Sequence, residues 1–213
     1  MTDARTHQGP RGVILAGGGA TRFEGRPKGL ERVGGVRILD RLVATFTEAL
    51  GEAPLLIANA PEAEGWRPGL EVHRDVRPGA GALGGLLSAL TAAGGRGVVV
   101  AAWDMPFVPA GLLRELAEGL GRHDACLPES EGRRGLEPML AAYGPGCLAP
   151  IAAALDRGDR RAVAFHDAVR VGILPLERVR RYGDPARLFF NVNTADDLAA
   201  AEAAWQALGS SRS

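Results

Sequence analysis

A glycine-rich segment followed by basic residues is the first part of the sequence that could do chemistry. The run Leu15-Ala16-Gly17-Gly18-Gly19 leads to Arg22, Arg26 and Lys28. Consecutive glycines leave backbone N–H groups accessible to an anion, and fixed cations pair with phosphate oxygens. Two familiar loops are excluded, because a dinucleotide fingerprint needs glycine where Arg22 stands and a Walker A loop needs Ser or Thr where Gly29 stands. We predict a phosphate-binding loop, with a plain strand-to-helix turn as the alternative.

Lys28 is the only lysine of the chain, so the other 24 of its 25 Lys and Arg residues are arginine. Lysine carries a compact charge on a flexible stem, whereas arginine carries a rigid fork of five donors. Biased codon usage with one chance survivor is the alternative explanation. The position of Lys28 in the glycine-rich segment favours a functional explanation, since a compact ammonium can pair with the phosphate oxygens that such a loop would bind.

Asp104 is the leading candidate for a metal ligand. It comes directly after the apolar run at 97–102, where a buried strand would deliver it to the ligand edge of a sheet. Pro106 favours an extended backbone before it and so directs the turn. A hard carboxylate oxygen suits Mg²⁺ shared between protein and substrate phosphates. A turn-forming or capping role before the helix at Pro109 is the alternative.

Two more polar residues follow short apolar runs. Asn59 follows the run at 54–58, and Asp75 follows the one at 70–73 and precedes a second glycine-rich segment at 79–85. Ligands of open α/β sheets bind beyond the carboxyl ends of the strands, so both residues are candidates for nucleotide contact. Turn formation is the alternative for each.

Asn191 and Asn193 could hold a second substrate. In an extended chain a two-residue spacing puts both side chains on one face. Asn offers a donor and an acceptor, which suits a polar heterocycle. Capping of the following helix by Asn193 or Thr194 is the alternative, and both roles can hold together.

The apolar pattern predicts the elements that must position these residues. Strand-like runs alternate with helical periods over short connections, which predicts an α/β fold with a Rossmann-like, doubly wound, mostly parallel sheet. We expect three α/β/α layers and a mixed edge of the sheet. The predicted strands are residues 12–16, 54–58, 70–73, 97–102, 124–127, 136–143 and 169–174. The predicted helices are residues 37–50, 83–93, 109–119, 146–157 and 194–208.

Composition narrows the class of protein. The 213 residues carry 25 Lys+Arg and 25 Asp+Glu, and this zero net charge weighs against nucleic-acid binding. No apolar run is long enough for a membrane span, and the polar N-terminus does not resemble a secretory signal. Two cysteines alone cannot frame a disulfide scaffold or a structural zinc site. We predict a cytoplasmic protein with a disordered tail over residues 1–11 and a single domain over residues 12–208.

The glycine-rich segment resembles the signature of the MobA-like nucleotidyltransferases, which is close to L-A-G-G-x-[ST]-x-R-M-G-x-D-K. The matching positions are Leu15, Ala16, Gly17, Gly18, Arg22 and Lys28. The departures are Ala20, Phe23, Glu24 and Pro27. Three further segments resemble motifs of this family: the D-x-P-[FY] segment that starts at Asp104, Asp75 with its glycine-rich loop, and an N-[IV]-N-T-x-x-[DE]-L motif that reads in full from Asn191 to Leu198.

The resemblance implies roles for individual residues. The implied catalytic residues are Arg22, Lys28 and Asp104, with Asp104 as the ligand of Mg²⁺. The implied nucleotide-binding residues are Leu15, Ala16, Gly17, Gly18, Lys28, Asn59, Asp75, Gly81 and Asp104. The implied acceptor-binding residues are Asn191, Asn193, Arg160 and Arg161. The two arginines resemble a paired-arginine stretch of the family, and a solvated helix start is their alternative.

For the guanylyltransferase branch, the resemblance implies transfer of GMP from MgGTP to the molybdenum-molybdopterin cofactor, with release of pyrophosphate. The implied partners are GTP and molybdenum-molybdopterin, with transient contacts to cofactor-synthesis or acceptor proteins and none to nucleic acid or membrane. The alternatives are a cytidylyltransferase, a family member with another acceptor, and a non-catalytic nucleotide-binding module. The presence of Arg22, Lys28 and Asp104 argues against the last of these.

Overall fold

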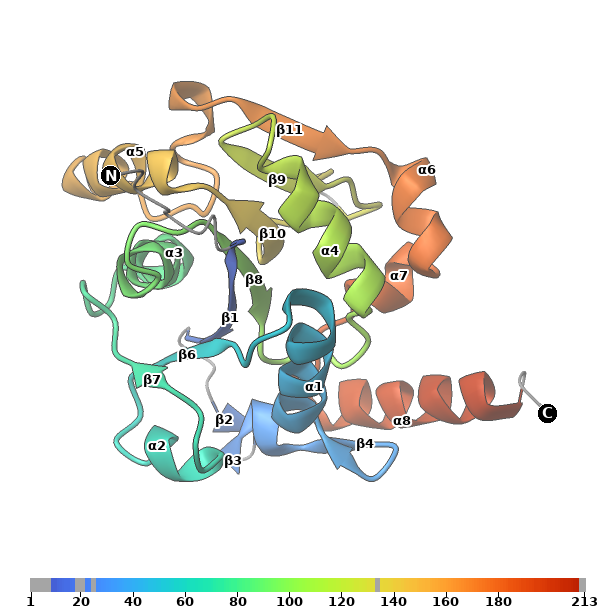
Figure 1. Ribbon diagram of the computed structural model, residues 1–213. Coiled ribbons are helices and arrows are strands. Elements are labelled where there is room, and N and C mark those ends of the chain that lie inside the picture. The colour runs from blue at the N-terminus through green and yellow to red at the C-terminus, as the bar shows by residue number, and fades with distance from the viewer. Residues whose placement is uncertain (1–8, 18–21, 24–25, 133–134, 211–213) are drawn as a thin grey trace, which may run out of the picture.

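A seven-stranded β-sheet forms the centre of the computed structural model (Figure 1). The structure describes residues 9–17, 22–23, 26–132 and 135–210. The strands lie side by side in the order β11-β9-β10-β8-β1-β6-β7. Their bounds are β1 Arg11–Ala16, β6 Leu55–Ala58, β7 Val72–His73, β8 Val98–Ala102, β9 Ala125–Pro128, β10 Leu140–Tyr143 and β11 Val171–Leu174.

Strand directions confirm the predicted, mostly parallel sheet. β1 pairs in parallel with β6 and with β8, and β6 pairs in parallel with β7. β10 runs antiparallel to both of its neighbours, β8 and β9, whereas β9 and β11 are parallel. The mixed part thus occupies the side of the sheet beyond β8, and the antiparallel strand β10 is the third from the edge formed by β11. The carboxyl ends of the six other strands therefore meet at one edge.

Helices cover both faces of the sheet (Figure 1). α1 (Ile38–Leu50) packs with α4 (Ala110–Gly119) on one face, and α3 (Gly81–Ala92) packs with α5 (Leu148–Asp156) on the other. Successive residues of a strand point to opposite faces. In β1, Ile14 accordingly joins the α1 core and Leu15 joins the α3 core. This arrangement confirms the predicted three-layer fold.

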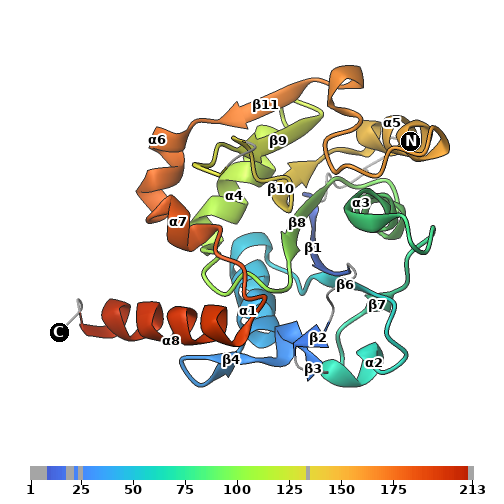
Figure 2. The ribbon, with the colours of Figure 1, turned by 180° about the vertical axis from the view of Figure 1, so that it is seen from behind.

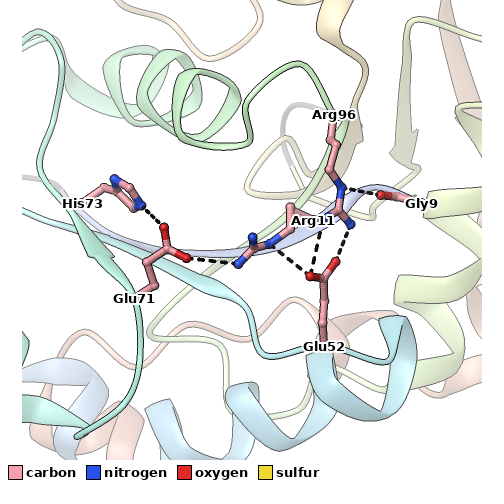
Figure 3. Close-up of polar contacts among 6 residues, drawn as sticks. All are labelled: Gly9, Arg11, Glu52, Glu71, His73 and Arg96. Atoms are coloured by element: carbon pink, nitrogen blue, oxygen red, sulfur yellow. Dashed lines mark hydrogen bonds and ion pairs between the residues drawn. The ribbon is translucent and has the colours of Figure 1, made fainter. Parts of the chain in front are cut away.

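Ion pairs fix the edge of the sheet at which β1 begins (Figure 3). Arg11 Nε lies 3.5 Å from Glu52 Oε2, and its Nη2 lies 3.4 Å from Glu71 Oε2. Glu52 also pairs with Arg96, whose Nε donates to the carbonyl oxygen of Gly9 at 2.8 Å. These contacts connect the N-terminal ends of β1, β6, β7 and β8 to one another. Ligands are therefore expected at the opposite, C-terminal ends of the strands.

The C-terminal helix α8 (Ala195–Ser210) docks on a small hairpin and then projects from the body (Figure 2). The hairpin consists of β4 (Arg32–Val33) and β5 (Val36–Arg37). At its turn, the N–H of Gly34 donates to Glu202 Oε2 at 2.7 Å. The Arg41 guanidinium lies 3.9 Å from the centre of the Trp205 ring, a cation–π contact. The middle of α8, at Glu202 and Trp205, is thus held by contacts that sequence periodicity does not indicate.

Replacing Gly34 by alanine should weaken this docking. Gly34 has φ +59°, and a Cβ there would overlap the Trp205 indole. We expect Gly34→Ala to destabilise the protein by about 2–4 kcal/mol, because left-handed strain and a steric clash add up. Chemical denaturation measures this loss. Gly35→Ala is the matched control, since Gly35 has φ +75° but no atom within 4 Å of its Cβ position. Equal losses in both variants would contradict the clash.

Several short elements lie outside the predicted set. They are β2 Arg22–Phe23, β3 Arg26–Pro27, β4, β5, α2 Ala63–Trp66, α6 Leu176–Val179 and α7 Pro185–Leu188. The predicted strand at 136–143 is shorter than expected, because residues 136–139 form part of a loop that ends at β10. β1 begins at Arg11, within the predicted tail, and residues 1–8 lie outside the described residues. No helix in the described ranges has the length and hydrophobicity to span a membrane.

Candidate functional site

The carboxyl ends of the parallel strands collect most of the predicted site residues at one edge of the sheet. Gly17 follows β1, Asn59 follows β6, Asp75 follows β7 and Asp104 follows β8. β1 lies between β6 and β8, so these residues surround the exit of the glycine-rich segment. A Cβ at Gly17 would meet no atom within 4 Å, which leaves its backbone open on that side.

Lys28 and Asp104 form an ion pair at this edge. Lys28 Nζ lies 3.9 Å from Asp104 Oδ2 and donates a hydrogen bond of 2.6 Å to Asn193 Oδ1. The residue Lys28 is 3% exposed, although lysine is almost never buried unless it is paired. The structure thus brings together Lys28 after the glycine-rich segment, Asp104 after β8 and Asn193 before α8.

Burial changes the acid–base behaviour of Asp104. Its desolvation raises the pKa of the carboxyl group above its ordinary value, and the positive charge of Lys28 opposes this rise only in part. The environment therefore disfavours the carboxylate in the protein alone. A further cation beside Asp104 would favour the ionised form.

Aromatic packing explains why Lys28 is held in place. It begins a 3-10 turn, Lys28–Leu30, and its neighbour Gly29 packs against the Trp103 indole. Trp103 stacks on Trp66, with ring centres 5.0 Å apart. A side chain at Gly29 would overlap Trp103, so only glycine permits this approach. The stacked Trp103 and Trp66 rings thus fix the turn that begins at Lys28. Because Trp103 directly precedes Asp104 in the chain, this packing keeps Lys28 close to Asp104.

A polar network holds the second glycine-rich segment. Asn59 Nδ2 donates to Asp75 Oδ2 at 2.6 Å, and the N–H of Asp75 donates back to Asn59 Oδ1 at 2.9 Å. The buried Ser88 hydroxyl accepts from the N–H of Val76 at 3.0 Å and lies 3.1 Å from Asp75 Oδ1. Asn59, after β6, therefore contacts one carboxylate oxygen of Asp75, and Ser88, on α3, contacts the other. Ser88 was absent from the sequence prediction, because a helical serine in an apolar run carries no signal of its own.

This network borders a pocket between β1, β6 and α3. Two of the predicted nucleotide-binding glycines and Asp75 are among its residues. The pocket is lined by Leu15, Gly17, Ile57, Asp75, Gly81, Ala82, Gly85 and Met139. Gly81 begins α3 with φ +66°, and its Cβ position is 3.9 Å from Arg160. The structure thus brings Leu15, Gly17, Asp75 and Gly81 together, while Ala16 is buried in the α1 core.

The predicted acceptor-binding residues fall into two separate groups. Asn193 reaches Lys28, whereas Asn191 Nδ2 donates to the carbonyl oxygen of Phe189 at 2.8 Å. Residues 190–193 lie outside the helices and strands. Thr194 caps α8, since its Oγ1 accepts from the N–H of Asp197 at 3.1 Å.

Arg160 and Arg161 lie on the α3 side of the sheet. They line a hollow of about 530 Å³ with Ala82, Glu137 and Met139, residues beside the pocket described above. A second hollow of about 580 Å³ continues from it and shares Arg161. The arginines thus lie along a groove that starts at α3, while Asn191 and Asn193 lie before α8.

Two predicted site residues, Gly18 and Arg22, lie wholly or partly outside the described part of the chain. Gly18 lies outside the described residues. Arg22 is placed by its backbone in β2, which pairs with β3 in a small antiparallel ribbon. The ribbon joins the glycine-rich segment to Lys28.

Comparison with known proteins decides the family. The model of the MobA-like NTP transferase domain matches residues 12–170. The chain belongs to the MobA-like NTP transferases. A protein named probable molybdenum cofactor guanylyltransferase from Pelotomaculum thermopropionicum is 35% identical over 187 residues, which are 88% of this chain and 89% of that protein. A molybdenum cofactor guanylyltransferase from Desulfosudis oleivorans is 31% identical over 92% of this chain and 96% of that protein.

A solved structure gives the same relationship in three dimensions. The molybdopterin-guanine dinucleotide biosynthesis protein A of Archaeoglobus fulgidus is 26% identical and superposes with a TM-score of 0.77 over 92% of this chain and 99% of that one. A 2-C-methyl-D-erythritol 4-phosphate cytidylyltransferase from Thermus thermophilus, 23% identical with a TM-score of 0.63 over 92% of this chain and 99% of that one, shares the fold. The predicted membership of the MobA-like transferases and the nucleotidyltransferase class are confirmed.

Proposed function

We propose that this MobA-like transferase moves GMP from GTP to the terminal phosphate of molybdenum-bound molybdopterin and releases pyrophosphate. The observation that carries the proposal is the buried Lys28–Asp104 pair at the carboxyl end of β8. A buried cation beside a carboxylate, next to an open glycine backbone, is suited to a polyphosphate and its metal ion. The names of the related guanylyltransferases favour GTP and molybdopterin over other substrates.

The nucleoside belongs in the pocket that contains Gly17, Asp75 and Gly81. From there, the phosphates extend toward the loop after β1 and reach Lys28. Asn59 holds Asp75 by one hydrogen bond to its carboxylate and one from its backbone N–H, so the sugar and base meet a fixed rather than a mobile polar group. Bound in this way, GTP presents its α-phosphorus between β1 and β8.

The reaction needs charge neutralisation more than acid–base chemistry. The acceptor phosphate oxygen attacks the α-phosphorus, and the bond to the bridging oxygen breaks with its electron pair leaving on pyrophosphate. An ionised phosphate needs no general base. The Lys28 ammonium offsets negative charge that develops on the departing pyrophosphate, and we propose the same role for Arg22. Both groups act by position, since neither forms a bond to the substrate.

The residues present fit a divalent metal ion of the Mg²⁺ type. Within the described residues no three His, Cys, Asp or Glu side chains converge as a protein-only metal site. Mg²⁺ in nucleotide enzymes uses one or two carboxylates and completes its shell with phosphates and water. Asp104 would hold the ion, which supplies charge for the triphosphate oxygens when bound. A bound cation would offset the desolvation that raises the pKa of the Asp104 carboxyl.

The groove along Arg160 and Arg161 is the place we propose for the acceptor. It continues from the nucleoside pocket, with which it shares Ala82 and Met139, and Arg160 offers positive charge for a phosphorylated molecule, whereas Arg161 is paired with Asp159. Asn191 precedes Val192, which belongs to the α1 core on the opposite face of the sheet from α3. Arg160 and Arg161 thus supply the main contacts in this proposal.

A nucleotide panel tests the proposal. We expect MgGTP to raise the melting temperature of the protein by a few degrees and MgCTP, MgATP and MgUTP to raise it less, because only a bound nucleotide stabilises the folded state. The matching activity assay measures pyrophosphate release from each nucleotide in the presence of molybdenum-molybdopterin. Selective stabilisation and turnover with CTP would replace GTP by CTP as substrate. No shift and no turnover with any nucleotide would contradict the transferase function.

A further inference from the structure

We propose that Asn193 is a positioning residue that holds the Lys28 ammonium at the triphosphate. This inference rests on the proposed function and deepens it, because sequence reasoning placed Asn193 at the acceptor. The two side chains are 165 residues apart in the chain, and Lys28 Nζ donates to Asn193 Oδ1 at 2.6 Å. Asn193 acts through the lysine and so differs from a residue that contacts substrate itself.

Asn193 supplies the hydrogen bond that Asp104 does not. The distance of 3.9 Å between Lys28 Nζ and Asp104 Oδ2 exceeds that of a hydrogen bond, so Asp104 attracts the ammonium only by charge. An ammonium has three directed donors and a flexible stem. The 2.6 Å bond to Asn193 therefore orients the group.

The turn that carries Asn193 is itself fixed from both ends. Asp197 Oδ2 accepts from the N–H groups of Asn193 and Thr194, each at 2.9 Å. Val192, which is fully buried, donates its N–H to the carbonyl oxygen of Asp104 at 2.9 Å. One short turn thus contacts the backbone of Asp104 and the side chain of Lys28. The relative position of the two charged groups depends on it.

The neutral amide suits this task. A carbonyl oxygen accepts from the ammonium without cancelling its charge, so the positive potential stays available for phosphate oxygens. A carboxylate at the same place would form a tight pair with Lys28 and compete with the triphosphate. Asn193 is exposed, so its removal leaves the packed core intact.

Calorimetry and kinetics of Asn193→Ala test the inference. Without acceptor, we expect the affinity for MgGTP to fall about 5- to 20-fold, because the loosened ammonium binds the triphosphate less well. With acceptor, we expect kcat to fall about 10- to 100-fold while KM for molybdenum-molybdopterin stays unchanged. In a Lys28→Met background, Asn193→Ala should lower kcat less than about twofold further, since coupled residues are non-additive.

Asp196→Ala is the matched control, because Asp196 is exposed in the first turn of the same helix, and it should keep wild-type affinity and kcat. Unchanged MgGTP affinity with a raised KM for the acceptor would overturn the inference in favour of acceptor binding. Additive effects of the Lys28 and Asn193 changes would overturn it as well. Failure of the proposed function is seen separately, in a wild-type protein that turns over no nucleotide.

Discussion

Lys28→Ala is expected to lower kcat by about 10²- to 10³-fold, which corresponds to about 3–4 kcal/mol of transition-state stabilisation. The lysine is 3% exposed and its ammonium lies 3.9 Å from Asp104, so water and salt screen it little. Its charge acts on the departing pyrophosphate more than on bound GTP, and the effect should therefore appear in kcat more than in KM. Pyrophosphate release under saturating MgGTP and acceptor measures it.

Two further variants separate charge from volume. Lys28→Met fills most of the space with an apolar chain, so it should lose activity as Lys28→Ala does while it keeps more of the stability. Lys28→Arg keeps the charge, but its planar fork must fit a buried site built around a compact ammonium beside Gly29. We expect it to be slower than wild type by about tenfold or more. A wild-type rate in Lys28→Ala would remove Lys28 from the mechanism, and a wild-type rate in Lys28→Arg would remove the argument for a lysine.

The sheet was predictable because each strand has a local sequence pattern. The runs that became β1, β6 and β8 are short, apolar and bounded by turn residues, and the alternation with helices requires crossovers between parallel strands. The polar residues after those strands followed from the same rule, since strand ends share an edge. Asn59, Asp75 and Asp104 therefore lie where the sequence placed them.

The features of the site and fold that the sequence could not predict depend on contacts between segments that lie far apart in the chain. Asn193 belongs to a motif that suits acceptor binding, yet its partner is Lys28, and no local pattern encodes a bond between residues 165 positions apart. The docking of α8 depends on Gly34 and Trp205, whose fit is a matter of shape. The short hairpin at β4 and β5 has only two residues per strand, too few for a period to appear.

Asp104→Asn is expected to remove nearly all activity without destabilising the protein. Asparagine keeps the shape but not the charge, so the metal ion loses its one proposed protein carboxylate. We expect kcat to fall by about 10³-fold and MgGTP to bind no better than GTP with the metal chelated, because the metal ion no longer links the nucleotide to the protein. Calorimetry with and without chelator, and pyrophosphate release over a range of Mg²⁺ concentrations, measure both effects.

The Asp104→Asn variant should be at least as stable as the wild type, although it loses activity. Burial raises the pKa of the Asp104 carboxyl despite the attraction of Lys28, so at neutral pH the ionised group destabilises the fold relative to a neutral one. Above the raised pKa the substitution should therefore leave the melting temperature equal or a few degrees higher, and the gain should vanish as the pH falls below the ordinary value of Asp. Asp196→Asn, in an exposed position, should change neither property.

Two results would contradict this prediction for Asp104→Asn. A strongly lowered melting temperature would mean that the pair with Lys28 serves the fold. Retained Mg²⁺-dependent turnover would mean that Asp104 does not hold the metal ion. Activity lost together with stability kept or gained would mark Asp104 as a residue maintained for its charge at the expense of the fold.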